Sequence, residues 1–140
     1  LHNSIVYADC ELGKVSFAYG GIGIVIHKNA EIANGVMIGQ GVTIGGNPGK
    51  FRVSDSKRLY VPKINENVYI AAGSRILGGI EIGSFSVIGT NSVVTKDTPP
   101  LSVIAGVPAK MINKITIENC LSYKSLFIFA CYIQKVQYES

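Results

Sequence analysis

Isoleucine recurs every six residues along much of this chain. The first series runs through Ile26, Ile32, Ile38 and Ile44, and a second series runs through Ile64, Ile70, Ile76, Ile82 and Ile88 to Val94. A helix has a period of about 3.6 residues and a strand has a period of about two, so neither element alone accounts for a spacing of six. The spacing therefore indicates a supersecondary unit that repeats along the chain.

Each repeat has the composition of one short strand and one corner. The residue two positions before the isoleucine is also apolar or small, as in Val36, Val42 and Ile80, so both side chains can point inward. The residue after it is often glycine or alanine, which suits a tight corner. If three units close one turn, residues three units apart stack in parallel ladders and form a β-helix of triangular section. The period alone fixes neither the number of faces nor the hand.

The period is interrupted in two places. Leu12 and Phe17 are closer together than one full repeat, which predicts a one-residue deletion or a bulge before Gly20. Between residues 46 and 61 the period stops and then restarts out of phase, in a polar and basic segment with two aromatic residues. We predict a protruding loop here that contributes to a site, because long loops in compact repeats are more often functional than idle. A disordered excursion is the alternative.

The end of the chain differs in kind from the repeats. Two prolines, Pro99 and Pro100, close the repeating region, and proline cannot donate to a further ladder. We expect a β-helix domain at 1–112, with its loop at 46–61, and a C-terminal extension at 113–140. The extension is rich in leucine and aromatic residues, so we expect it to pack on the column or on a neighbouring subunit. Contact with a membrane surface is the alternative.

The composition limits the partners and the compartment. There are 13 Lys and Arg residues against 9 Asp and Glu, a net charge of +4. The basic residues are scattered without an aromatic stripe, so we expect no nucleic acid partner, although a phosphorylated ligand is compatible. Cys10, Cys120 and Cys131 are an odd number without a C-x-x-C spacing, so we expect reduced thiols, no metal site and a cytoplasmic protein. No signal peptide is evident, and the apolar runs are too short to span a bilayer.

Three segments resemble the hexapeptide-repeat acyltransferases, and within them serine acetyltransferase and its polysaccharide-modifying relatives. They are GVTIGG at 41–46, VYIAAGSRILG at 68–78 and AGVPAK at 105–110. The resemblance extends from about Gly20 to Ile112. It implies an all-β fold, a left-handed parallel β-helix that forms a homotrimer and binds acetyl-CoA between subunits. It also implies acetyl transfer from acetyl-CoA to a hydroxyl of a small molecule such as serine, or of a saccharide.

The histidines depart from the pattern of the serine enzymes. The resemblance aligns Gly20 and Val61 with the two catalytic histidines of those enzymes, so both are missing here. Transfer of an acyl group to a hydroxyl needs a general base, and histidine suits that role. His2 lies at the terminus, outside the repeat, and we interpret it as incidental. An inactive homologue that only binds acetyl-CoA, or a structural β-helix, is the alternative function.

His27 is the candidate base. It follows Ile26 at a corner, and the position one turn later is Gly45, at the root of the loop, so we predict that His27 lies beneath that loop. A pattern like YGGIGIVIH at 19–27 is also shared by sugar-modifying members of the family. Asp9, which lies one turn below if the regular register holds, or Asp55 of the loop could orient the ring. A surface corner histidine without a role is the alternative.

The resemblance also implies the residues that hold the cofactor. Small residues would border the pantetheine arm, and two lysines would bind the nucleotide phosphates; these residues are Gly46, Ala72, Gly78, Gly89, Thr90, Lys96 and Lys110. The small residues could equally serve tight corners, and the lysines a solvated surface. With two histidines in the chain, the three-histidine zinc site of carbonic anhydrases on this fold is excluded.

Overall fold

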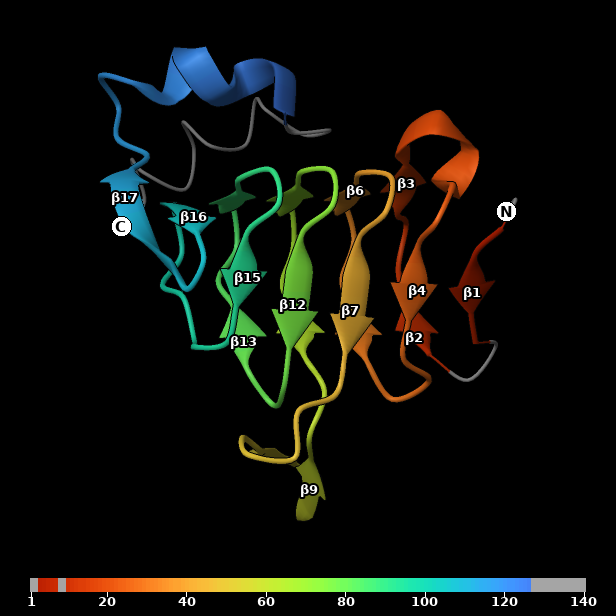
Figure 1. Ribbon diagram of the computed structural model, residues 1–140. Helices are drawn as coiled ribbons and strands as arrows, with labels where there is room; N and C mark the ends of the chain where they lie inside the picture. The colour runs from red at the N-terminus through yellow and green to blue at the C-terminus, as the bar shows by residue number, and fades with distance from the viewer. Residues whose placement is uncertain (1–2, 8–9, 127–140) are drawn as a thin grey trace.

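The structure is a computed structural model that describes residues 3–7 and 10–126. Short strands wind around a common axis and form a column with three flat faces (Figure 1). The coil that contains β1 lies at one end, and β16 and β17 lie at the other. The prediction of an all-β, left-handed parallel β-helix of triangular section is confirmed.

Each face of the column is one sheet. In hydrogen-bonded order, the first contains β1 (Ile5–Val6), β4 (Val25–Ile26), β7 (Thr43–Gly45), β12 (Arg75–Leu77) and β15 (Val93–Val94). The second contains β13 (Glu81–Ile82), β10 (Lys63–Ile64), β5 (Glu31–Ile32) and β2 (Glu11–Leu12). The third contains β17 (Ala109–Lys114), β16 (Ser102–Gly106), β14 (Val87–Ile88), β11 (Tyr69–Ile70), β6 (Met37–Ile38) and β3 (Ser16–Phe17).

The ladders explain the period of the sequence. Ile64 pairs with Ile82, and Ile26 pairs with Ile44, so each isoleucine stacks on the one that lies three repeats further along the chain. Across the loop the spacing changes, because Ile44 pairs with Ile76, whereas a regular coil would bring Pro62 to that position. The coil at the loop is therefore longer than a regular coil. The ladder nevertheless continues without a break, so the insertion leaves the column intact.

The core is a continuous stack of isoleucine and valine side chains. The inward residues of the ladders, such as Ile44, Ile76 and Ile82, have no exposed surface. Toward the C-terminal end, buried serines replace some of them, and their hydroxyls bond to the backbone. For example, the Ser74 hydroxyl donates to the carbonyls of Ala71 and Gly89, each at 2.8 Å. The buried serine hydroxyls are thus hydrogen-bonded, whereas the buried Asn67 Oδ1 has no hydrogen-bond partner among the described residues.

The N-terminal coils are longer than the regular ones. A short 3-10 helix, η1 (Ala18–Gly21), lengthens the coil there, and Val6 pairs with Ile26, whereas a regular coil would bring Ile24 to that position. The predicted one-residue deletion between Leu12 and Phe17 is confirmed, because these residues pair with Ile32 and Ile38, which are six residues apart. The regular register that would bring Asp9 one turn below His27 does not hold, because the pairing of Val6 with Ile26 puts Tyr7 at that position. Asp9 itself lies outside the described residues, as does His2.

The C-terminal part closes the column and packs on one of its faces. The antiparallel pair of β16 and β17 lies at the end of the third sheet. The following 3-10 helix, η2 (Cys120–Leu126), packs through Cys120 and Tyr123 on Phe85 and Val87. The packing predicted for the extension is confirmed up to residue 126, while the domain boundary after residue 112, which falls inside β17, stays a prediction.

Two further sequence predictions concern the thiols and the membrane. Cys10 and Cys120 are free and buried, and burial raises the pKa of the Cys10 thiol. Cys131 lies outside the described residues. Within residues 3–7 and 10–126, no helix has the length and apolar character needed to cross a membrane.

Candidate functional site

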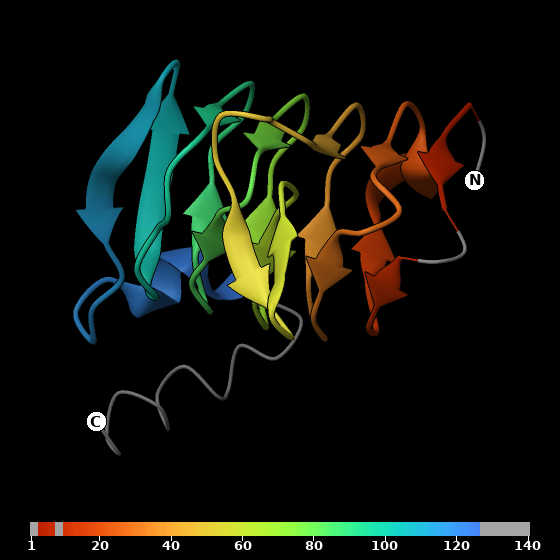
Figure 2. The same ribbon diagram turned by 90° about the horizontal axis from the view of Figure 1, so that it is seen from below.

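The insertion forms a two-stranded ribbon beside the column. Its strands are β8 (Arg52–Ser54) and β9 (Lys57–Leu59), which pair antiparallel. Figure 1 shows the ribbon projecting from the column, and Figure 2 shows it over the middle coils, with its strands running across the long axis of the column. The ribbon starts and ends at neighbouring points, since the Asn47 amide donates to the Tyr60 carbonyl at 3.1 Å. The predicted protruding loop is therefore an ordered element.

The ribbon packs on two glycines of the column, Gly78 and Gly79, which we call its seat. The Gly79 amide donates to the Lys50 carbonyl at 2.8 Å, and a Cβ at Gly79 would lie 2.3 Å from the Arg52 amide nitrogen. Gly78 has a φ of +96°, and its Cβ would lie 3.1 Å from that of Asn47. Glycine is thus required at 79 by close approach and at 78 by conformation. This packing accounts for Gly78, which the sequence had suggested as a cofactor residue.

We expect Gly79→Ala to displace the ribbon while the column stays folded. The new Cβ would overlap ribbon backbone that has no flexible end to move aside, at a cost of about 1–3 kcal/mol. Amide hydrogen exchange at residues 52–59 should become faster. Gly49→Ala is the matched control, because its Cβ would meet only the side-chain oxygen of Asn47. Equal exchange in the two variants would show that Gly79 is not the seat.

His27 lies beneath the root of the ribbon, as the sequence predicts. The His27 amide donates to the Ile44 carbonyl at 2.9 Å, so the His27 corner stacks under Gly45. A pocket of about 490 Å³ lies between this corner and the ribbon. Its walls come from His27, Asn29, Gly46, Asn47, Pro48, Arg58, Leu59, Tyr60 and Val61. The pocket thus lies between the candidate base, the ribbon and the segment in which the chain rejoins the column, Val61 and Pro62, which we call the return segment.

The imidazole of His27 has one identified partner. Its Nδ1 accepts a hydrogen bond from the Asn29 backbone amide at 3.1 Å. A neutral ring in this arrangement carries its proton on Nε2, because Nδ1 uses its lone pair for Asn29. Among the described residues, no carboxylate lines the pocket. Asp55 lines a neighbouring pocket together with Lys28 and Lys57.

Arg58 and Tyr60 of the insertion line the pocket, and both contact the ring of Phe51. The Arg58 guanidinium lies 4.7 Å from the centre of the Phe51 ring, which in turn contacts the Tyr60 ring at 5.9 Å between centroids. In the part of the chain that the structure describes, Arg58 has no ion pair. An arginine held over an aromatic ring keeps donors for an anionic or hydroxyl-rich ligand. Arg58 and Tyr60 belong to the loop that the sequence predicts as part of a site, but only the ribbon's path determines which of its residues face His27. Asn29, at the His27 corner, was not predicted.

The residues suggested for the cofactor fall in separate places. Lys96 and Lys110 line one pocket of about 290 Å³ at the C-terminal end of the column. Ala72 stacks on the Gly39 corner, where an added Cβ would lie 2.6 Å from the Ala72 nitrogen. A Cβ at Gly89 would lie 3.0 Å from that of Ala105. The structure thus brings the two lysines together, and it gives Ala72 and Gly89 packing roles in the corners.

Two other residues of this set are less informative. Gly46 lines the His27 pocket, with its Cβ position 3.6 Å from the Tyr60 carbonyl. Thr90 is exposed beside Gly89 and lies outside the pockets described above.

Within residues 3–7 and 10–126, no group of three or more His, Cys, Asp or Glu side chains has a geometry that could hold a metal ion.

Comparisons with known sequences point to one kind of protein. Residues 62–96 match the family model described as bacterial transferase hexapeptide (six repeats). The serine acetyltransferase of Staphylococcus aureus strain Mu50 is 40% identical over 109 residues, which are 78% of this chain and 48% of that protein. The serine acetyltransferase of Bacillus subtilis strain 168 is 36% identical over 123 residues, or 86% of this chain and 54% of that protein. The chain spans about half the length of these relatives.

Solved structures give the same result. A serine acetyltransferase in complex with cysteine superimposes with a TM-score of 0.69 at 36% identity, over 80% of this chain and 41% of that one. The serine acetyltransferase of Brucella abortus strain S19 in complex with coenzyme A has a TM-score of 0.66 at 35% identity, over 77% and 41% of the two chains. The column is therefore similar in sequence and in shape to the β-helix of these proteins.

Proposed function

The chain is a hexapeptide-repeat protein that resembles the serine acetyltransferases, and from this premise we propose that it transfers an acetyl group from acetyl-CoA to a hydroxyl group. The acceptor is serine or a sugar of a polysaccharide or its precursor. The identity of 36% to the Bacillus relative over 86% of this chain supports the transferase activity. The coenzyme A complexes of similar structures support acetyl-CoA as the donor.

The pocket at His27 is the observation that carries this proposal. Acetyl-CoA supplies a thioester, whose C–S bond breaks when the acceptor oxygen bonds to the carbonyl carbon. The hydroxyl must lose its proton as it attacks, and His27 is the side chain in this pocket suited to take it. Arg58 and Asn29 line the same pocket and would orient the acceptor.

His27 can act as a base only after its ring leaves Asn29. In the described arrangement Nδ1 is occupied and Nε2 carries the proton, so no free lone pair faces the acceptor. The bond to Asn29 is local and exposed, and such a bond contributes about 0.5–1.5 kcal/mol. Binding of the acceptor can offset that cost. We therefore assign His27 as the general base, with a ring rotation that precedes proton transfer.

Lys96 and Lys110 are our candidates for the nucleotide phosphates of acetyl-CoA. They line one pocket with Thr95, Thr98 and Asp97, so two cations and two hydroxyls border it together with one carboxylate. Ala72, Gly89 and Thr90, with Gly46 and Gly78 nearer the ribbon, remain candidates for the wall along the pantetheine arm. Their small side chains would let that arm approach the backbone.

The assembly and the location of the protein are also proposals. The resemblance favours a homotrimer, and the reduced thiols favour the cytoplasm.

An inactive acetyl-CoA-binding protein is the second candidate. The resemblance puts Gly20 and Val61 at the positions of the catalytic histidines of the serine enzymes, and the Nδ1 atom of His27 already accepts a hydrogen bond. Such a protein would bind acetyl-CoA and leave the thioester intact.

An acceptor panel separates these functions. We expect the purified chain to release free CoA from acetyl-CoA when serine or one of a set of sugars is present, and acetylated product to appear in equal amount. Binding of acetyl-CoA without turnover on any acceptor would favour the inactive homologue. Turnover with sugars but not with serine would assign the acceptor.

A further inference from the structure

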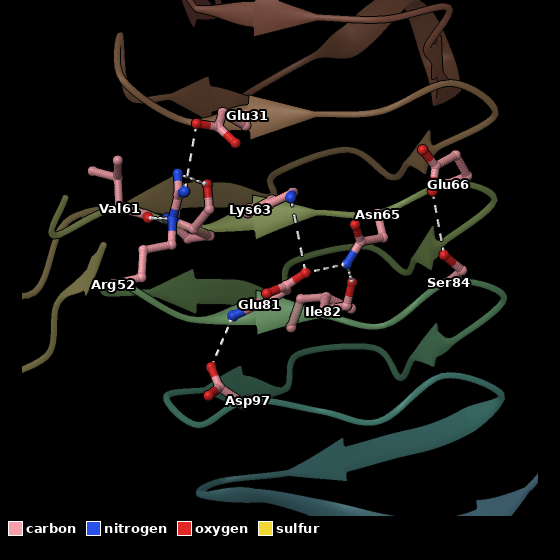
Figure 3. Close-up of polar contacts among 11 residues, drawn as sticks. Glu31, Arg52, Val61, Lys63, Asn65, Glu66, Glu81, Ile82, Ser84 and Asp97 are labelled. Atoms are coloured by element: carbon pink, nitrogen blue, oxygen red, sulfur yellow. Dashed lines mark hydrogen bonds and ion pairs between the residues drawn. The ribbon is translucent and has the colours of Figure 1, made fainter. Parts of the chain in front are cut away.

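Arg52 is the residue through which the ribbon is tied to the column. It lies at the start of β8, and its side chain is only 12% exposed. Its Nε donates to the Val61 carbonyl at 2.8 Å, its Nη2 donates to the Pro62 carbonyl at 3.5 Å, and its Nη1 lies 3.4 Å from the Glu31 carboxylate (Figure 3). One planar group thus contacts two separate parts of the chain.

These partners are parts of the His27 pocket or border it. Val61 is the residue of the return segment that lines the pocket. Glu31 begins β5, directly after the corner in which the Ala30 amide donates to the His27 carbonyl at 3.0 Å. Arg52 itself is the first residue of the ribbon, and Arg58 of the same ribbon lines the pocket. The guanidinium therefore links the ribbon, the return segment and the strand that follows His27.

The contact is more shielded than an ordinary surface ion pair. Glu31 is 22% exposed, whereas the neighbouring pair on the same face, Lys63 and Glu81, is 42% and 54% exposed at 4.0 Å. Shielding from water strengthens the Arg52 contacts, and the flat guanidinium can bond to several acceptors at once in a fixed geometry. A lysine at 52 would keep the charge but lose that arrangement.

We propose that Arg52 is a positioning residue of the acceptor pocket, and that the Arg52–Glu31 pair holds the ribbon and Val61 at the right distance from His27. This inference rests on the proposed function. Arg52 is absent from the lining of the pocket, so it acts through the residues it holds.

The test compares Arg52→Met with Lys63→Met. The second variant removes the exposed ion pair on the adjacent strand and is the matched control. We expect Arg52→Met to raise the acceptor KM about 10- to 100-fold, while the KM for acetyl-CoA changes less than about threefold, because a small displacement of pocket walls weakens productive binding. Amide hydrogen exchange at residues 52–59 should become faster in Arg52→Met and stay unchanged in Lys63→Met.

A cycle of variants separates positioning from general stability. Glu31→Gln keeps an oxygen for Nη1, so its acceptor KM should stay within about fivefold of the wild type. Arg52→Met should mask the effect of Glu31→Gln in the double variant, because the two residues share one contact. An unchanged acceptor KM in Arg52→Met would overturn the inference even if ribbon exchange increased, and additive effects in the double variant would also overturn it.

The same measurements distinguish the two proposals. A wild type that acetylates no acceptor overturns the proposed function, and with it the role of Arg52 in acceptor binding. Unchanged ribbon exchange in Arg52→Met, in a protein that does acetylate an acceptor, overturns the role of Arg52 alone.

Discussion

His27→Ala is expected to lower acetyl transfer to the acceptor about 100-fold or more. Loss of a general base typically costs a factor of this size, since the hydroxyl must then lose its proton to water. The binding of acetyl-CoA should change less than about threefold, because His27 lies in the pocket under the ribbon and not with Lys96 and Lys110. Steady-state rates and direct binding of acetyl-CoA, measured for the same preparations, check both statements.

A second variant at this position tests which role the ring has. Glutamine at 27 can donate a hydrogen bond from its amide but cannot accept a proton at neutral pH. If His27 is the base, His27→Gln is as defective as His27→Ala. If the ring only donates from Nε2, as its bond to Asn29 favours, His27→Gln retains most of the activity. That result would contradict the assignment of His27 as the base while leaving the pocket in place.

Ile76→Ala is expected to lower the free energy of unfolding by about 2–5 kcal/mol. Ile76 has no exposed surface and stacks between Ile44 and Val94 in the first sheet. In a column each coil is covered only by its neighbours, so a cavity at one level weakens two interfaces at once. Urea denaturation followed by far-UV circular dichroism measures the change.

Val53→Ala is the control for that measurement. It removes methyl groups from a β-branched side chain that is 66% exposed on the ribbon. A change within about 0.5 kcal/mol is expected there, as for surface positions in general. If Ile76→Ala were as mild as Val53→Ala, the isoleucine stack could not be the main source of column stability.

The scaffold could be predicted because one rule applies to every coil. Each inward isoleucine faces another isoleucine or valine one coil away, as Ile64 faces Ile82, so a local pattern determines a long-range contact. Counting along the repeat fails where the coil length changes. A regular turn would bring Asp9 below His27, but η1 lengthens that coil, and the pairing of Val6 with Ile26 puts Tyr7 there.

The site could be predicted only in part. The corner of His27 belongs to the regular column, so its place under Gly45 follows from counting along the repeat. Arg52 and Glu31 are distant in the sequence, and their contact depends on the path of the ribbon, which follows no period. Gly78 shows the same limit, because a glycine that seats a ribbon looks in sequence like a glycine that borders a ligand.

Because the ribbon joins the column at one junction, the sequence of the ribbon can change without changing the stability of the column. Since Asn47 and Tyr60 are hydrogen-bonded to each other at the base of the ribbon, the structure of the column does not depend on how many residues lie between them. The pairing of Ile44 with Ile76 resumes past the insertion as though it were absent. Lengthening such an insertion costs little loop entropy, since each doubling adds only about 0.6 kcal/mol. During evolution the ribbon can therefore be replaced by a different insertion, which changes the ligand that the pocket recognises while the β-helix stays the same.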